Sequence, residues 1–220
     1  MSRIALVAGG TGLVGGHLVK IIVDSNEFRE IKVLIRKGNK FEMDGITSIE
    51  VDYDHLINSE RYLKADCVFC CLGTTIKKAG SKEKFQMVDY TYPHELAKIT
   101  LQNGSRQFNV ITASGANSKS MFFYNRLKGD IEHALKNLGY ENLNIFRPSL
   151  LLGDRNEKRL GEEIGALVAK TVNPLLMGNL KKLRAIQAET VAKAMVEVSL
   201  RKYLGARIFE SYEIQELGQL

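Results

Sequence analysis

The sequence predicts an α/β fold, a doubly wound parallel sheet with a small C-terminal lobe. Strand-type and helix-type segments alternate from the first residues, the strands are almost continuously apolar, and a glycine-rich turn joins the first strand to the first helix. Strands that are apolar on both sides are typical of parallel sheets covered by helices on each face. The 220 residues suit one such unit, so we expect residues 1–220 to form a single domain.

The alternation of strands and helices runs through the first two thirds of the chain. The expected strands are short and apolar, and the expected helices repeat apolar residues at intervals of three and four. In order, the segments are strand Ile4–Ala8, helix Leu13–Val23, strands Ile31–Ile35, Ser48–Val51 and Asp66–Leu72, helix Phe85–Leu101, strand Phe108–Ala113, helix Ser120–Leu138 and strand Leu143–Phe146.

The pattern changes after Arg147-Pro148. Residues 149–185 are loop-like, then helical, with an interruption at Asn173-Pro174, and a last helix is expected at Ala188–Leu200. This part is too short for an independent domain. We expect 149–185 to form a small substrate or lid lobe over the carboxyl edge of the sheet, where such folds bind ligands.

Composition excludes several classes of protein. Hydrophobic residues make up 45% and charged residues 25% of the chain, the ordinary balance of a soluble globule. No apolar run reaches the ~18 residues of a membrane span. Because Met1-Ser2-Arg3 leads into a strand and not into a secretory signal, we expect a cytoplasmic protein.

The net charge of +6 raises nucleic-acid binding as a weaker alternative. The basic residues, including Lys77-Lys78, are in separate clusters interleaved with acids, which favours solvated surface positions over a nucleic-acid surface. A pocket for cofactor phosphates accounts for part of the excess, and we expect no nucleic-acid partner.

The three cysteines, Cys67, Cys70 and Cys71, all lie in one expected strand. Side chains alternate along a strand, so Cys67 and Cys71 face one side and Cys70 the other. Three thiols divided in this way do not converge on one ion, and a lone Cys-x-x-Cys is a weak metal signal. We interpret them as buried small hydrophobes and predict no metal site.

The glycine-rich turn carries the first functional signal. It follows the first strand and opens the first helix, and it satisfies both Gly-x-x-Gly-x-x-Gly and Gly-x-Gly-x-x-Gly. Its residues are Gly9, Gly10, Thr11, Gly12, Leu13, Val14 and Gly15. In a Rossmann fold such glycines make the tight turn and admit the cofactor pyrophosphate to the helix N-terminus. A purely structural turn is the alternative, but this context predicts dinucleotide binding.

The end of the second strand bears on which dinucleotide binds. Sites that prefer NAD place an acid there, on the ribose 2′-hydroxyl. This chain has Arg36 and Lys37 instead, and a guanidinium can hold a 2′-phosphate by paired hydrogen bonds. The alternative is that both are ordinary solvated cations. We therefore expect NADP(H), with NAD(H) less favoured.

A candidate catalytic set follows the strand Phe108–Ala113. Tyr124 and Lys128 are four residues apart on the next expected helix, which puts them on one face. That spacing also arises by chance, but its place after a strand that ends in Ser114 is the short-chain dehydrogenase arrangement. Lys128 would lower the pKa of Tyr124, which would exchange the proton, and Ser114 would bind the substrate carbonyl. Thr112 is the second choice for this hydroxyl.

Further motifs extend along nearly the whole chain. They are the glycine turn, Cys71-Leu72-Gly73-Thr74-Thr75, Val88-Asp89-Tyr90, Phe122-Phe123-Tyr124, Lys128-Gly129, the segment from Phe146 to Leu152, and the charged run Arg155–Arg159 leading to Gly161-Glu162. By these motifs the sequence resembles the Tat-interacting-protein-like branch of the atypical short-chain dehydrogenase/reductase superfamily, whose members are NAD(P)-binding proteins.

The resemblance implies roles for further residues. It places Arg36 near the 2′-phosphate and Lys128 on the nicotinamide ribose. The adenine would be bordered by Asp52 and Tyr53, the cofactor groove lined by Leu72, Gly73 and Thr74, and the nicotinamide approached by Arg147 and Pro148. One departure is Asp89, at a helical position where many relatives carry the asparagine of a proton relay.

Two classes of function fit these features. The first is an NADPH-dependent oxidoreductase acting on a small carbonyl substrate; the second is a non-enzymatic NADP(H) sensor that binds a protein partner. The charged run at 155–163 is a surface salt-bridge network or, alternatively, selects substrate through Arg155 or Arg159. The sequence leaves the oligomeric state open.

Overall fold

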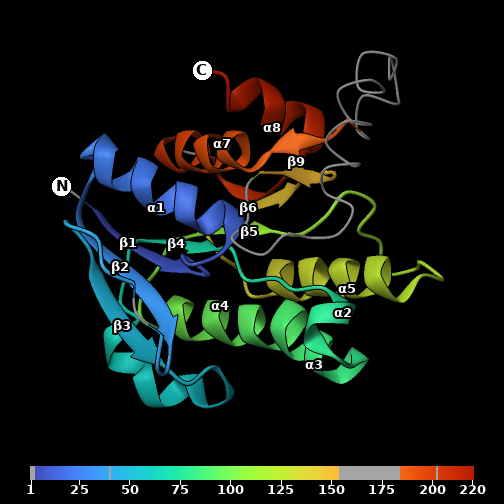
Figure 1. Cartoon of the computed structure of the whole chain (residues 1–220), viewed down its shortest axis with the longest axis horizontal. Coiled ribbons are helices and arrows are strands. Elements are labelled where there is room, and N and C mark those ends of the chain that lie inside the picture. Colours follow the sequence, from blue (N-terminus) through green and yellow to red (C-terminus); the bar gives the residue numbers. More distant parts are fainter. Residues whose placement is uncertain (1–2, 40, 154–183, 202) are drawn as a thin grey trace.

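The computed structural model describes residues 3–39, 41–153, 184–201 and 203–220, and its centre is a parallel sheet of seven strands (Figure 1). The strand order is β3-β2-β1-β4-β5-β6-β9, and every pairing is parallel. The strands are β1 (Arg3–Ala8), β2 (Phe28–Arg36), β3 (Thr47–Val51), β4 (Cys67–Cys70), β5 (Gln107–Ile111), β6 (Asn142–Arg147) and β9 (Gly205–Glu210). The order reverses between β1 and β4, so the predicted doubly wound sheet is confirmed.

Helices cover both faces of this sheet (Figure 1). On one face lie α1 (Leu13–Ser25), α7 (Ala188–Leu200) and α8 (Ser211–Leu217); on the other lie α2 (Ile76–Ala79), α3 (Lys82–Gln86), α4 (Tyr92–Gln102) and α5 (Phe123–Asn137). Each face has its own apolar core, one built around α1 and α7 and the other around α4 and α5. The near-continuous apolar strands of the sequence are explained by this burial on two sides.

The cysteines divide between the two cores as predicted. Cys67 belongs to the core under α1 and α7, with Cys71 packed against it, whereas Cys70 belongs to the core under α4 and α5. Burial raises the pKa of Cys67 to about 12 and that of Cys70 to about 12, so both thiols stay protonated. No cluster of three or more metal-ligating side chains occurs in the described residues.

Several elements differ from the sequence-based expectation. The expected helix Phe85–Leu101 is α3, then a π-helical turn η2 (Met87–Thr91), then α4. Helix α5 starts at Phe123 because the preceding loop forms its own turn, in which the Ser120 hydroxyl accepts a hydrogen bond from Phe122 N. The elements that were not predicted are the 3₁₀ segment η1 (Tyr53–Tyr62), the short helix α2, the two-residue strands β7 (Leu151–Leu152) and β8 (Ile186–Gln187), edge strand β9 and helix α8.

The predicted lobe is described only at its two ends. The short strand β7 (Leu151–Leu152) pairs in parallel with β8 (Ile186–Gln187). Residues 154–183, which include the charged run Arg155–Arg159, lie outside the described residues. In the part of the chain that is described, the helices are too short or too polar to cross a bilayer.

Candidate functional site

The glycine turn between β1 and α1 is closed by a hydrogen bond from Gly12 N to Gly9 O of 2.9 Å. Gly9 has φ of 83°, which favours glycine, and a Cβ there would lie 2.7 Å from the Cys71 carbonyl oxygen. A Cβ on Gly15 would lie 2.1 Å from Gly9 O. The turn therefore packs too closely against β4 and against itself for any larger side chain at these two positions.

The N-terminus of α1 is open toward solvent. Thr11 and Gly12 are exposed, no side chain caps the helix, and its first turn carries no acidic residue. The first amides of a helix have no partner within it and lie at its positive end. At the end of the tight glycine turn, these open amides form a positively polarised site that suits a phosphate group.

The other predicted cofactor residues follow the ends of parallel strands at the same edge of the sheet. Arg36 ends β2 and Lys37 follows it, both exposed, and within the described ranges no hydrogen bond or ion pair engages the Arg36 guanidinium. The Leu72–Thr74 loop follows β4, and a Cβ on Gly9 would lie 3.0 Å from Leu72 N. The loop and the glycine turn are thus in direct contact.

Asp52 and Tyr53 follow β3 and begin the η1 segment. The Asp52 carboxylate caps this segment by accepting from Asp54 N at 3.0 Å, and its hydrogen bond with His55 lowers its pKa. Tyr53 is buried and packs on Tyr92 with ring centroids 5.4 Å apart. Within the described residues its hydroxyl has no hydrogen-bond partner.

Lys128 and Asp89 form a buried ion pair beside the Leu72–Thr74 loop. The Lys128 ammonium lies 2.7 Å from Asp89 Oδ1, and the two side chains are only 5% and 1% exposed. The second Asp89 oxygen accepts from Thr74 N at 2.8 Å. Burial acts to lower the pKa of Lys128, but the Asp89 carboxylate, with a smaller contribution from Tyr124, outweighs it and raises that pKa.

Tyr124 lies one turn before Lys128 on α5, and its side chain is 39% exposed. Its ring packs against the buried Phe85 with centroids 5.8 Å apart. The structure therefore brings the tyrosine and the lysine of the predicted set together on one helix face, with the lysine inside and the tyrosine at the surface.

The two candidate hydroxyls after β5 have different surroundings. Thr112 is buried, and its Oγ1 donates to Glu132 Oε1 at 2.7 Å. Ser114 is half-buried; its backbone N donates to the Pro148 carbonyl at 2.9 Å, and its hydroxyl makes no hydrogen bond to the described residues. Ser114 is thus the available hydroxyl, and Thr112 is engaged in the interior.

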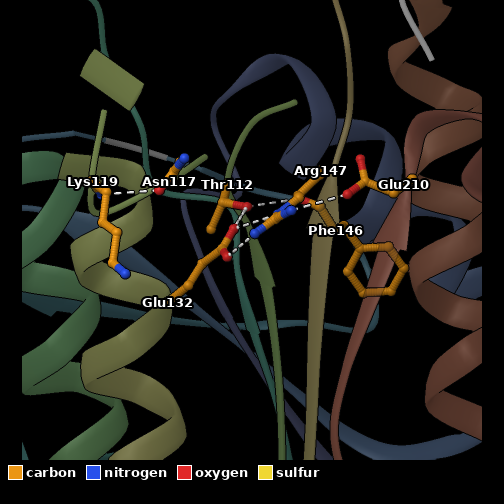
Figure 2. Close-up of polar contacts among 7 residues, drawn as sticks. All are labelled: Thr112, Asn117, Lys119, Glu132, Phe146, Arg147 and Glu210. Carbon is orange, nitrogen blue, oxygen red and sulfur yellow. Dashed lines mark hydrogen bonds and ion pairs between the residues drawn. The ribbon is translucent and has the colours of Figure 1, made fainter. Parts of the chain in front are cut away.

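Figure 2 shows the network that engages Thr112. Arg147 donates from Nε and from one terminal nitrogen to the two carboxylate oxygens of Glu132, at 2.9 Å and 2.5 Å. Its other terminal nitrogen donates to Glu210 at 3.0 Å. All three guanidinium nitrogens therefore bind carboxylates of the protein. Pro148 is buried beside this network, and any contact of the Arg147–Pro148 segment with a cofactor would come from the backbone.

Sequence reasoning missed Glu132 and Glu210 and identified Asp89 only as a departure. One signal was available for Glu132, which is four residues after Lys128 and therefore on the same face of α5 as the candidate catalytic pair. Charged residues on a buried face call for partners. No comparable signal exists for Glu210, because its strand was not predicted.

No family model matches the chain, but curated relatives do. The protein HTATIP2 of Rattus norvegicus is 33% identical over 168 residues, which is 73% of this chain and 68% of the relative. The protein FMP52 of Candida albicans is 33% identical over 199 residues, 84% of each chain.

Solved structures share the fold at low identity. MoeE5 in complex with UDP-glucose and NAD superposes with a TM-score of 0.70 at 16% identity, covering 97% of this chain and 80% of that one. The UDP-glucose 4-epimerase of Thermotoga maritima gives a TM-score of 0.71 at 12% identity, covering 98% and 81%.

Fold, glycine turn and relatives together define the class as the short-chain dehydrogenases/reductases with a Rossmann fold. Within that class, the chain belongs to the HTATIP2-like family of atypical members. The resemblance drawn from the sequence motifs is therefore confirmed.

The cytoplasmic location expected from the sequence is wrong. The FMP52 relatives from several fungi are named mitochondrial, which points to mitochondria and away from the cytoplasm. The expectation had rested on the lack of a secretory signal. That feature argues against secretion only and carries no information about import into an organelle.

Proposed function

We propose that this protein is an NADP(H)-dependent oxidoreductase that reduces a small carbonyl compound at Ser114, Tyr124 and Lys128. One observation carries the proposal: a buried, charged lysine lies one helical turn from a surface tyrosine and is tied through Asp89 to the loop beside the glycine turn. Burying a charged pair to this extent is costly, and such groups are more frequent at functional sites than elsewhere.

Several features at this edge of the sheet support a dinucleotide with a 2′-phosphate as the cofactor. The open amides at the N-terminus of α1, presented by the tight glycine turn, would hold the pyrophosphate. The exposed Arg36 guanidinium, with no partner among the described residues, would hold the 2′-phosphate. Asp52 and Tyr53 would border the adenine, and Leu72, Gly73 and Thr74 would line the groove.

The catalytic roles follow from the surroundings of each side chain. The bound cofactor would supply a hydride to the carbonyl carbon. Ser114 would donate a hydrogen bond to the carbonyl oxygen, and Tyr124 would give that oxygen its proton. Lys128, held charged by Asp89, would donate to the cofactor ribose and stabilise the tyrosinate that remains.

The test is NADPH oxidation by wild type and Ser114→Ala across aldehydes, ketones and quinones, with Thr112→Ala as the matched control. We expect Ser114→Ala to lose turnover by about tenfold or more, whereas Thr112→Ala changes stability and not the chemical step. Turnover that depends on Thr112 and not on Ser114 would overturn the assignment.

A second candidate is an NADP(H) sensor that binds a protein partner. It is favoured by two apolar side chains directly before α5, Met121 at 94% and Phe122 at 75% exposure, since large exposed apolar groups often mark an interaction site. In that case Tyr124→Phe leaves partner binding intact, and Gly12→Val, which blocks cofactor entry, abolishes it.

Because fungal relatives are named as mitochondrial proteins, we also infer a mitochondrial location for this protein. Import of a fluorescent fusion into mitochondria tests this inference.

A further inference from the structure

Asp89 is placed by an irregular element of the fold. It lies in η2, the π-helical turn between α3 and α4, and such turns often occur at functional sites because they redirect a side chain out of the regular helix. Here the redirected carboxylate reaches two groups from different parts of the chain, the Lys128 ammonium of α5 and the Thr74 amide after β4. One side chain thus connects the candidate catalytic helix to the Leu72–Thr74 loop.

The ion pair leaves the ammonium with unused donors. A lysine ammonium has three N–H donors, and among the described residues Asp89 is the one acceptor paired with it. Its other electrostatic neighbours are Tyr124 on its own helix and Cys70 on β4. At 5% exposure, water has little access to the remaining donors, so they suit hydroxyl acceptors of a bound ligand.

We propose that Asp89 is a positioning residue that holds the Lys128 ammonium charged and at a set distance from the Leu72–Thr74 loop, with two N–H donors presented to the cofactor. This inference rests on the proposed function for the identity of the ligand. Its physical content is independent of turnover: without the Asp89 charge, Lys128 loses its proton at a lower pH than in wild type, and the Leu72–Thr74 loop loses its connection to α5.

The sign of the effect follows from the two opposing influences on Lys128. Burial is the larger single influence and lowers its pKa, while Asp89 more than offsets it, so the pKa is raised in the protein. Wild-type Lys128 is therefore charged across the neutral and moderately alkaline range. In Asp89→Asn the largest influence that opposes burial is lost, so the pKa of Lys128 falls, whereas Asp89→Glu keeps the charge.

The experiment has two readouts. The first is the titration of Lys128 by NMR of side-chain-labelled lysine from about pH 6 to 11, assigned with Lys128→Arg. The second is the dissociation constant of NADPH over the same range, measured by fluorescence. The variants are Asp89→Asn and Asp89→Glu, with Asp130→Asn on α5 as a control that removes the same charge from a half-buried position.

We expect wild type and Asp130→Asn to bind NADPH with the same affinity up to strongly alkaline pH. In Asp89→Asn, the Lys128 titration and the alkaline loss of affinity should both move down by about one pH unit or more, which is about tenfold in affinity at the shifted pH. Asp89→Glu should restore the titration while weakening binding at all pH values, because its longer side chain displaces the ammonium.

Equal Lys128 titration in wild type and Asp89→Asn would overturn the inference, as would an equal shift in Asp130→Asn. If Asp89→Asn does not fold, the titration of Lys128 in wild type tests the inference alone. A wild-type Lys128 pKa below the ordinary lysine value would show that Asp89 does not keep the ammonium charged. If NADPH binds neither wild type nor any variant, the proposed function is refuted. The NMR titration of Lys128 would then still test the proposed role of Asp89.

Discussion

Two buried ion pairs lie on α5, one turn apart, and they differ in how completely their hydrogen-bonding capacity is used. In the Glu132–Arg147 pair, each guanidinium nitrogen has a carboxylate acceptor, and Glu132 also accepts from Thr112. In the Asp89–Lys128 pair, one ammonium donor is used among the described residues and Asp89 is completed by a backbone amide.

We interpret this difference as one between a structural role for the Glu132–Arg147 pair and the proposed ligand-binding role of the Asp89–Lys128 pair. The Glu132–Arg147 network joins β5, α5, β6 and the β9–α8 junction, where Glu210 is also the capping residue of α8. Every nitrogen of the Arg147 guanidinium has a carboxylate acceptor within the protein, and the network fixes the edge of the sheet. In the Asp89–Lys128 pair, by contrast, two N–H donors of the buried ammonium have no acceptor among the described residues. Buried donors normally have partners, so these two are expected to bind a ligand near the Leu72–Thr74 loop.

Breaking the Glu132–Arg147 network should have the largest effect on stability. Glu132→Ala leaves Arg147 with Glu210 alone and removes the shorter of the two hydrogen bonds that the Thr112 hydroxyl donates. Loss of one partner of a buried ion pair costs roughly 3–5 kcal/mol, to be measured by urea unfolding. Glu197→Ala, which breaks the exposed Arg201 pair, is the control and should cost less than about 1 kcal/mol. Equal costs for the two would remove the distinction.

The next effect concerns Arg36, a cation with no partner in the described residues. If spare donors mark ligand contacts, Arg36→Ala should weaken NADPH binding by about 1–3 kcal/mol, since a charge-assisted hydrogen bond to phosphate is lost. NADH binding and unfolding free energy should not change. Calorimetry on both cofactors measures this, and equal wild-type affinity for NADPH and NADH would contradict the assignment.

Thr112→Val removes a single hydrogen-bond donor from the Glu132–Arg147 network, which separates a structural from a catalytic role of the Thr112 hydroxyl. Glu132 keeps its two bonds from Arg147, so the unfolding free energy should fall by about 1–2 kcal/mol. Turnover should stay close to wild type because the hydroxyl faces Glu132 and not the substrate. A fall in kcat of about a hundredfold in Thr112→Val would make Thr112 the catalytic hydroxyl in place of Ser114.

The smallest effect is expected at the thiols of β4, which lie on opposite faces of the sheet. Burial raises the pKa of Cys67 and of Cys70 to about 12, so at neutral pH almost no thiolate is present. Alkylation in the folded protein should be much slower than in urea for both residues. Rapid labelling of Cys70 alone would show that the α4–α5 side of the sheet opens.

Much of this architecture could be predicted from local sequence. Near-continuous apolar runs indicated the parallel strands, and the glycine spacing located the turn before α1, because both depend on neighbours in the chain. Strand β9 could not be found in this way. Its residues Gly-Ala-Arg-Ile-Phe-Glu lie at the sheet edge and the first three are exposed, so they lack the apolar run that indicates a central strand.

The site was predicted only as far as local spacing allowed. Tyr124 and Lys128 are one helical turn apart, so the helix period put them together. The Asp89 partners come from a loop and a helix that only the tertiary fold brings together, and the choice between Ser114 and Thr112 depended on Glu132. Arg147 was expected at the nicotinamide, but its guanidinium is bound by two carboxylates, those of Glu132 and Glu210, and Glu210 belongs to the unpredicted β9.

The central claim is that the Tyr124–Lys128 end of α5 is the reactive end. The most direct measurement is NADPH oxidation with a responsive carbonyl substrate by wild type and Tyr124→Phe, alongside their NADPH dissociation constants. Because the substitution removes only the phenolic oxygen, we predict that kcat falls by roughly 10²–10⁴ while NADPH affinity is unchanged. Turnover that persists undiminished in Tyr124→Phe would contradict the account.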